Sequence, residues 1–429
     1  MKPSHGKVPI SIVAIVVCVF AFVGLLYTKD IGYISSATVL SISSCKPELI
    51  IDHPNKSPSV EKKVNSAPEE VLGSDEEEDK DEFYPHCRVD RGKWVFNSSF
   101  KPLYSDRTCG YLERQVACVK NGRPDSDYRH WEWKPDECIL PRFDPKLALE
   151  KLRGKRLMFV GDSLQRGQWE SFVCMVEFMI PTEEKSMKRG HVHSVFKAKG
   201  YNATIEFYWA PYLVESNSDF PIIDDIKKRI LRVDRVAKHA KHWVDVDILV
   251  FNTYIWWLNG YKIKTLWGSF PNEEEGYEEL DAPSAYRVAL RTWANWVDTT
   301  IDPNKTRVFF TTMSPTHMRS ADWNNKKGKR CFNETRPYLK RGHWGTGSDK
   351  RIMEAVVSVT ERMQVPITFI NITQISEHRI DGHTSVYTET GGKLLTDEQK
   401  ADPLHYADCI HWCLPGVPDT WNQLFLAYL

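Results

Sequence analysis

Apolar and polar positions divide the chain into three stretches with different patterns. Residues 8–27 form an unbroken run without a charged side chain. Residues 28–82 are rich in Pro, Ser and charge and hold few large apolar side chains. From residue 83 to 429, short apolar runs alternate with polar stretches, as in a folded domain. This division predicts a membrane span, a solvated acidic stem and a globular body.

Within the body, short buried strands alternate with amphipathic helices. Apolar runs predict strands at residues 155–161, 247–252, 307–312 and 367–372. Helical spacing predicts helices at 164–178, 348–363 and 283–297, the last with Asp281 near its N-cap. Such alternation predicts an α/β fold with a parallel, doubly wound sheet and helices on both faces. In such sheets, sites lie beyond the carboxyl ends of the strands.

The segment 87–140 has a different composition from the core that follows it. It is rich in Cys, Trp and turn residues and has few long periodic stretches. We interpret it as a disulfide-stapled cap that packs on a core of residues 155–429, both within a body of residues 83–429.

The apolar run of residues 8–27 is long enough to cross a bilayer. Its 20 residues span ~30 Å as a helix, which matches the hydrocarbon thickness. No small-residue cleavage site follows it, so we expect a signal anchor. Lys2 and Lys7 precede it and predict a cytoplasmic tail of residues 1–7. The body then lies in a secretory lumen, as in a single-pass type II protein.

Cysteines and glycosylation sequons agree with a lumenal body. Of ten Cys, eight lie in the body, an even number that is typical of four disulfides in an oxidising compartment. Eight Cys allow 105 pairings, so spacing alone does not choose among them. Sequons that fit a glycosylated surface occur in the body at Asn97, Asn202, Asn304, Asn333 and Asn371.

Net charge hides an uneven distribution. The 429 residues hold 57 Lys+Arg and 57 Asp+Glu. Residues 1–27 carry +2 and residues 28–82 carry −7, so the remainder carries +5. We interpret the acidic stretch as a spacer, because such a run repels itself and stays solvated. The neutral balance argues against a nucleic-acid partner.

Ser163 is the first candidate for chemistry. It stands in Gly161-Asp162-Ser163, at the end of the first predicted strand and just before a helix. The N-terminus of that helix would favour a developing oxyanion. An ordinary helix N-cap serine fits the same position equally well.

The C-terminal stretch strengthens the catalytic interpretation. Asp408 and His411 are three residues apart and would share one face of a helical turn. The carboxylate would orient the imidazole, which would take a proton from Ser163 as in a catalytic triad. A structural Asp–His pair and a zinc site remain alternatives. The zinc site would use His405, Asp408, Cys409, His411 and Cys413. Because thiols in an oxidising lumen form disulfides, we expect no metal.

Other polar and aromatic residues follow predicted strand ends and are candidates for oxyanion or substrate contacts. Asn252 ends its strand, and its side-chain amide is a candidate oxyanion donor. Substrate candidates with aromatic or charged side chains are Trp256, Trp257, His317, Arg319 and Trp323. Aromatic rings stack on sugars, although core packing accounts equally well for any single Trp.

Two motifs resemble a known family. The stretches FVGDSLQRGQWESFVC and DCIHWCLPGVPDTWNQLF closely resemble the plant trichome birefringence-like family of polysaccharide O-acetyltransferases. The resemblance covers residues 83–429 and implies an SGNH/GDSL-esterase fold in the Golgi membrane. It implies Ser163 as nucleophile, His411 as base and Asp408 as its orienting residue. It also implies the disulfides Cys87–Cys138 and Cys109–Cys174; the pairs Cys118–Cys409 and Cys331–Cys413 are a guess.

The family members most similar to this chain acetylate xylan. We therefore expect an O-acetyltransferase that acts on the 2- or 3-hydroxyl of xylosyl residues through an acetyl-serine. An acetylesterase with the same triad, action on another wall polymer (mannan, xyloglucan or pectin) and a non-catalytic polymer binder are the alternatives. No cofactor is expected, and the sequence does not identify the acetyl donor.

Overall fold

A computed structural model describes residues 88–258, 262–267 and 276–429. The predicted tail of residues 1–7, the span of residues 8–27, the whole stem of residues 28–82 and Cys87 lie outside these residues. Among the described helices, none has the length and hydropathy needed to cross a membrane.

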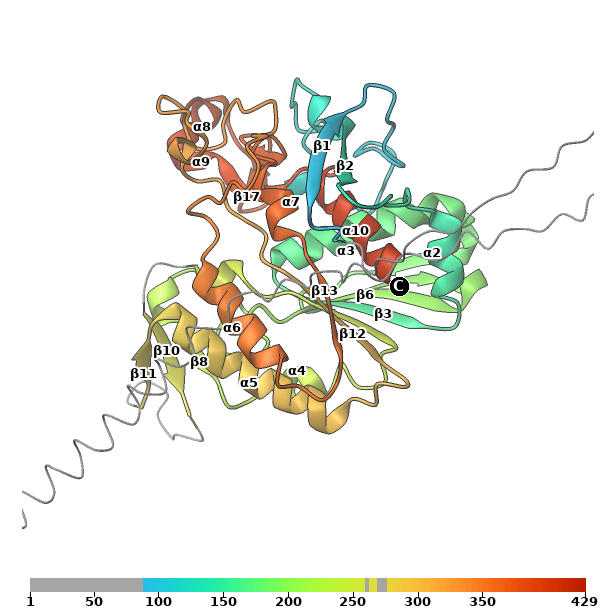
Figure 1. The fold of residues 1–429 in the computed structure, drawn as a ribbon, viewed down its shortest axis with the longest axis vertical. Coiled ribbons are helices and arrows are strands. Elements are labelled where there is room, and N and C mark those ends of the chain that lie inside the picture. Colours follow the sequence, from blue (N-terminus) through green and yellow to red (C-terminus); the bar gives the residue numbers. More distant parts are fainter. Residues whose placement is uncertain (1–87, 259–261, 268–275) are drawn as a thin grey trace, which may run out of the picture. The chain divides into compact units, whose positions relative to one another are not determined.

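The core is built on a seven-stranded sheet. Its order is β13 (Ile367–Ile370), β12 (Arg307–Thr311), β9 (Ile248–Phe251), β3 (Arg156–Gly161), β6 (Ala203–Trp209), β5 (His193–Ala198) and β4 (Lys185–Lys188). The five strands from β13 to β6 run parallel, with β3 between β9 and β6. Figure 1 shows the sheet edge-on between its helices.

The sheet is mixed, whereas the sequence predicted a parallel one. Strands β4 and β5 pair antiparallel at the edge beyond β6. The chain returns from β5 to β6 through a short turn that ends at Asn202, whose φ is +49°. Such a tight connection only joins antiparallel strands, because a parallel pair needs a long crossover.

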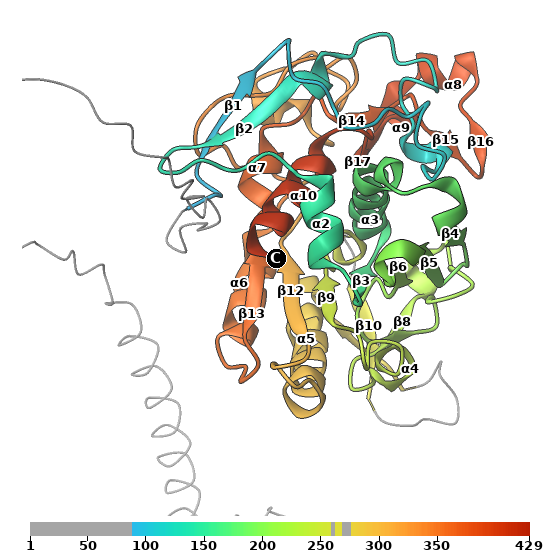
Figure 2. The ribbon, with the colours of Figure 1, turned by 90° about the vertical axis from the view of Figure 1, so that its right-hand side faces the viewer.

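Helices cover both faces of the sheet, as predicted. Helices α2 (Pro145–Lys151), α3 (Ser163–Val176) and α10 (Val417–Tyr428) cover one face, and α5 (Ala282–Thr300) and α6 (Lys350–Thr360) cover the other (Figures 1 and 2). Along β3, Leu157 and Phe159 join the apolar core under the first group, while Met158 and Val160 join the core under the second. Burial on both faces explains why β3 reads as a continuous apolar run.

The predicted core elements agree with the structure to within a few residues. The four predicted strands are β3, β9, β12 and β13, and the three predicted helices are α3, α5 and α6. Asp281 is the N-cap residue of α5, as predicted. The strands β4, β5 and β6 were not predicted.

The cap segment packs over α10 and α7 (Thr373–Glu377) (Figures 1 and 2). It contains the antiparallel pair β1 (Gly92–Phe96) and β2 (Trp131–Pro135). The indole of Trp94 donates a 2.9 Å hydrogen bond to the carbonyl oxygen of Ile375. The predicted disulfide Cys109–Cys174 is confirmed and ties the cap to α3.

Short elements complete the described residues. A four-stranded sheet holds β11 (Glu278–Leu280), β10 (Ile263–Leu266), β8 (Ile230–Arg232) and β7 (Glu215–Ser216). Two-stranded sheets pair β14 (His383–Ser385) with β17 (Asp408–Trp412), and β15 (Glu389–Thr390) with β16 (Lys393–Leu394). The remaining α-helices among the described residues are α4 (Ala237–Ala240), α8 (Asp397–Ala401) and α9 (Pro403–Tyr406).

The predicted glycosylation sites differ in exposure. Asn202, Asn304 and Asn333 are exposed, whereas Asn97 and Asn371 are half-buried. The side chain of Asn97 also donates a 2.9 Å hydrogen bond to Glu132.

Candidate active site

Ser163 lies where β3 ends and α3 begins, at the carboxyl edge of the sheet. The chain at the end of strand β9 leaves little room at this turn. A Cβ atom on Gly161 would stand 2.2 Å from the carbonyl oxygen of Asn252, so only glycine fits there. The close approach of β9 therefore fixes the path of the chain into Ser163.

Asp162 caps the helix that begins with Ser163. Its carboxylate accepts a 2.9 Å hydrogen bond from the Leu164 amide. The side chain is fully buried, and burial raises its pKa to about 6 although the amides of Leu164 and Tyr254 favour the charged form. The Ser163 amide belongs to the first turn of α3, where N–H groups have no acceptor within the helix.

Asp408 and His411 lie on strand β17, so the predicted helical turn is wrong. Residues three apart on a regular strand point to opposite faces. Here Oδ1 of Asp408 accepts hydrogen bonds from the amides of Ile410 and His411, both at 3.0 Å. These bonds fold the carboxylate back along the strand, so that its other oxygen reaches the His411 ring.

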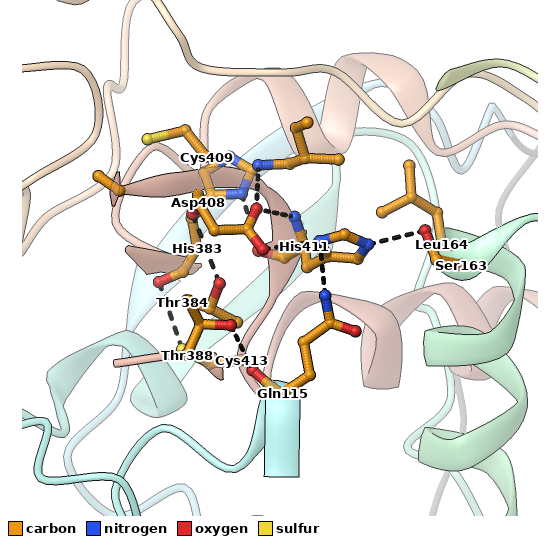
Figure 3. A network of polar contacts seen from close by, with 12 residues as sticks. Gln115, Ser163, Leu164, His383, Thr384, Thr388, Asp408, Cys409, His411 and Cys413 are labelled. Carbon is orange, nitrogen blue, oxygen red and sulfur yellow. Dashed lines mark hydrogen bonds and ion pairs between the residues drawn. The ribbon is translucent and has the colours of Figure 1, made fainter. Parts of the chain in front are cut away.

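The structure brings the three predicted triad residues into contact (Figure 3). Nδ1 of His411 lies 2.7 Å from Oδ2 of Asp408, and Nε2 lies 2.7 Å from the Ser163 hydroxyl oxygen. The carboxylate fixes a proton on Nδ1, which leaves the lone pair of Nε2 to accept the hydroxyl proton. This is the geometry of a serine nucleophile with its general base.

Asp408 is held in its charged form. Burial alone would raise the pKa of the Asp408 carboxyl. The charge of His411 and hydrogen bonds from its ring and backbone outweigh that effect and hold the pKa well below its usual range. An ionised Asp408 is the form that can orient an imidazole and stabilise an imidazolium.

Disulfides hold the catalytic strand on both sides of His411. The pairs are Cys331–Cys409 and Cys118–Cys413, so the predicted pairs Cys118–Cys409 and Cys331–Cys413 are wrong. The segments that lie next to each Cys explain the observed pairing. The Cys331 amide contacts Cys409, whereas the chain after Cys413 runs beside the cap, where the Leu414 amide donates to the carbonyl oxygen of Val116.

The predicted pair Cys87–Cys138 lies partly outside the described residues, because Cys87 does. Cys138 itself is disulfide-bonded.

The zinc alternative does not fit these residues. Cys409 and Cys413 are in disulfides, and a disulfide sulfur is not the thiolate that zinc requires. His405 is exposed and pairs with Asp402 at 2.6 Å. The described residues contain no cluster of three or more His, Cys, Asp or Glu suited to a metal.

His317 was predicted to contact substrate, but it is buried behind the catalytic strand. Its Nδ1 lies 2.6 Å from Nε2 of His383, whose ring stacks on Trp412. Nδ1 of His383 lies 3.1 Å from the carbonyl oxygen of His411. Burial lowers the pKa of both imidazoles, to about 3 for His383. The pair supports the backbone that carries His411, and the prediction of a substrate contact is wrong.

Two of the other candidates are buried and hydrogen-bonded within the core. Both hydrogens of the Asn252 amide are donated to the carbonyl oxygens of Thr311 and Thr312 in the core, so the predicted oxyanion donor is wrong. The buried indole of Trp257 donates to Thr253.

The remaining candidates are divided between the core and the surface. The buried indole of Trp323 donates to Glu334. Trp256 is half-buried with the Arg229 guanidinium 4.1 Å from its ring centroid, and the Arg319 side chain is 67% exposed. Of the predicted substrate contacts, Trp256 and Arg319 thus keep accessible surface.

The sequence missed a residue whose side chain contacts the imidazole of the triad. Gln115 lies in the cap, on the helical turn Arg114–Val116, and its Nε2 is 3.2 Å from Nδ1 of His411 (Figure 3). Its Oε1 accepts a 3.3 Å hydrogen bond from Arg166, three residues after Ser163. The position of Arg166, one helical turn beyond Ser163, could have marked Arg166 as a residue near the site. Nothing in the sequence around Gln115 marks it.

An α/β sheet whose central strand leads to a serine beside a His–Asp pair is an arrangement typical of serine acyl-transfer enzymes. Two family models match the chain. Residues 140–428 match the GDSL/SGNH-like acyl-esterase family found in Pmr5 and Cas1p, and residues 85–139 match the PMR5 N terminal domain.

Relatives match over the full length. "Protein trichome birefringence-like 3" of Arabidopsis thaliana is 59% identical over 437 residues, covering 100% of this chain and 99% of the relative. "Probable xylan O-acetyltransferase 8" of Oryza sativa subsp. japonica is 50% identical over 438 residues with the same coverage. The chain therefore belongs to this GDSL/SGNH-like acyl-esterase family, and the predicted trichome birefringence-like resemblance is confirmed.

Proposed function

We propose that the chain is an O-acetyltransferase that acetylates the 2- or 3-hydroxyl of xylosyl residues in xylan through an acetyl-Ser163 intermediate. The unbroken contact from Ser163 through His411 to Asp408 carries the proposal. Membership of an acyl-esterase family supports acyl transfer, and relatives named xylan O-acetyltransferases support the acceptor.

In the first half-reaction, Ser163 takes the acetyl group. Nε2 of His411 accepts the hydroxyl proton as the Ser163 oxygen attacks the carbonyl carbon of the donor. The charge on the carbonyl oxygen develops at the first turn of α3, where the Ser163 amide donates to it. The bond to the leaving group then breaks, and the leaving group takes the proton from His411.

In the second half-reaction, a sugar hydroxyl removes the acetyl group. The hydroxyl gives its proton to Nε2 of His411 while its oxygen attacks the acetyl carbon. The ester bond to Ser163 breaks, and the serine oxygen regains a proton from His411. Water in place of the sugar would release acetate, so an esterase and a transferase differ only in the acceptor.

We further propose that the enzyme is a single-pass type II protein of the Golgi membrane with its catalytic body in the lumen. The apolar run of residues 8–27, preceded by Lys2 and Lys7, supports an anchor of this orientation. Disulfides among the described residues support an oxidising compartment.

The test uses the full chain, p-nitrophenyl acetate as the donor and xylohexaose as the acceptor. We expect acetylated xylohexaose, with the position read by NMR, and a loss of at least about 10³-fold in Ser163→Ala. Retained transfer in that variant would refute the triad. Acetate release without acetylated sugar would refute the transferase in favour of an esterase.

A further inference from the structure

One polar side chain next to the triad has no part in the mechanism above. We propose that Gln115 is an acceptor-binding residue, whose side-chain N–H donates to the sugar hydroxyl adjacent to the one that is acetylated. The inference rests on the proposed function, because it concerns the second half-reaction. It would make the cap part of the active site.

The contact between Gln115 and His411 is not an ordinary hydrogen bond. Nδ1 of His411 gives its proton to the ionised Asp408 at 2.7 Å. The Gln115 amide nitrogen, 3.2 Å from Nδ1, carries only hydrogens and is a donor. Two donors therefore face each other, and the His411 ring offers the amide no lone pair. The amide hydrogens are free to bind another acceptor.

Arg166 determines which end of the Gln115 amide faces the triad. Its Nη2 donates to Oε1 of Gln115 at 3.3 Å, and its Nε lies 3.4 Å from Glu113. Arginine is always protonated and accepts no hydrogen bond, so the amide oxygen must point to Arg166 and the nitrogen to His411. The guanidinium therefore holds the amide in the orientation that presents its N–H groups.

The backbone of Gln115 is tied to the same structure as His411. The Thr388 hydroxyl donates to the Gln115 carbonyl oxygen at 3.1 Å, and the Leu414 amide donates to that of Val116 at 3.0 Å. The disulfide Cys118–Cys413 joins the two segments covalently. Gln115 is thus a preorganised donor at a fixed place beside the base.

Position and chemistry together indicate the ligand. Asp408 accepts the proton of Nδ1, so the Gln115 nitrogen, 3.2 Å from the same atom, is not its hydrogen-bond partner. Gln115 is half-buried and keeps access to solvent. A hydroxyl that gives its proton to Nε2 would place its neighbouring hydroxyl toward Gln115. A pyranose with two adjacent free hydroxyls has this arrangement, and a neutral amide suits a neutral acceptor.

The test compares Gln115→Met with Gln423→Met in the full chain. Gln423 donates a 2.6 Å hydrogen bond to Pro141, directly after the cap segment, so its loss controls for a weakened attachment of the cap. We expect Gln115→Met to raise the KM for xylohexaose about tenfold, the value of about one hydrogen bond, while acylation by p-nitrophenyl acetate slows less than threefold.

A second measurement reads binding without chemistry. In a Ser163→Ala background, Gln115→Met should weaken xylohexaose binding about tenfold, and Arg166→Met should do the same with no further loss in the double variant. If Gln115→Met slowed acylation and acetyl transfer equally, the proposal would be overturned, because Gln115 would then act on His411 and not on the sugar. Unchanged sugar binding, or the same loss in Gln423→Met, would also overturn it. If the wild type binds xylohexaose but transfers nothing, the proposed function fails while this binding arm still tests Gln115.

Discussion

The two sides of the triad are held by different kinds of structure. Ser163 is positioned by local structure packed into the sheet, because strand β3, Gly161 with the Asn252 carbonyl against it, and the N-cap residue Asp162 directly precede it. His411 is positioned by distant segments. Strand β17 and the residue after it, Cys413, are joined by disulfides to Cys331 and Cys118, and His383 contacts the His411 carbonyl.

This difference separates the ways in which each side can be disturbed. The nucleophile depends on packing in the sheet core, so its geometry should survive any change that leaves the core intact. The base depends on individual links across the chain, each of which a substitution can remove. Substitutions near Ser163 should therefore mainly lower the free energy of unfolding. A substitution around His411 should either lower kcat or lower stability by the contribution of the one link that it removes.

The largest expected effect comes from Asp408→Asn. The asparagine amide would donate toward Nδ1 and favour the tautomer with its proton on Nε2, which cannot accept the Ser163 proton. We expect kcat for acetyl transfer to fall by about 10³–10⁴-fold with little change in the free energy of unfolding. Steady-state kinetics with p-nitrophenyl acetate and xylohexaose measure this loss.

Asp402→Asn is the matched control for that experiment. Asp402 and His405 have the same three-residue spacing and a contact of 2.6 Å, but their side chains are 46% and 77% exposed. We expect no change in kcat, because this pair lies outside the triad. A similar loss of kcat in Asp402→Asn and Asp408→Asn would contradict the triad, because any Asp–His pair with this three-residue spacing would then have the same effect.

The next effect tests the covalent links to the base. Replacing both Cys118 and Cys413 with Ser should lower the free energy of unfolding by about 4 kcal/mol. The pair Cys331 and Cys409 should cost about 1 kcal/mol less, because 78 residues separate its Cys instead of 295. Urea unfolding of both double variants provides the comparison. Equal losses would argue against chain entropy as the source of the difference.

The same contrast explains what the sequence predicted. Strand β3, helix α3 and the later strands and helices of the core were predictable because their patterns are local and their burial is regular. The triad residues were predicted from their motifs. The secondary structure of Asp408–His411 was not, since hydrogen bonds to the Asp408 carboxylate give a strand the same contact that a helical turn would give.

Errors concentrate where contacts join distant segments. Two disulfide pairings were exchanged, because nothing local shows that the chain after Cys413 runs beside the cap. Trp257 and Trp323 were candidates for sugar contacts, yet both are buried. A tryptophan has the same sequence signature in a core and on a binding surface. Gln115 reaches His411 across 296 residues and had no signal at all.

On the nucleophile side, Gly161→Ala should be the most destabilising small change. Its Cβ would meet the Asn252 carbonyl oxygen at 2.2 Å and the Gln165 Cβ at 2.9 Å. We expect a loss of about 3 kcal/mol in the free energy of unfolding. Gly167→Ala, four residues into the same helix, has nothing within 4 Å of the new Cβ and should gain about 0.5–1 kcal/mol. Equal effects would show that the turn into Ser163 tolerates a side chain.

The smallest effect concerns the support behind the base and depends on pH. Folded His383 has its pKa lowered to about 3 by burial, whereas an unfolded histidine titrates near 6.5. Between these values the unfolded state binds more protons, so stability falls as the pH falls. At pH 5 this one imidazole lowers the free energy of unfolding by about 2 kcal/mol relative to pH 8.

His383→Phe should remove that cost while keeping a ring stacked on Trp412, which lies 3.9 Å from the His383 centroid. The variant loses the contacts with His317 and with the His411 carbonyl, so we expect lower stability than wild type at pH 8 and a smaller decrease on going to pH 5. Urea unfolding at both pH values measures the difference. His405→Phe, a change at an exposed ring, should follow the wild-type dependence. Parallel curves for His383→Phe and wild type would show that the imidazole behind the catalytic strand does not make this region sensitive to acid.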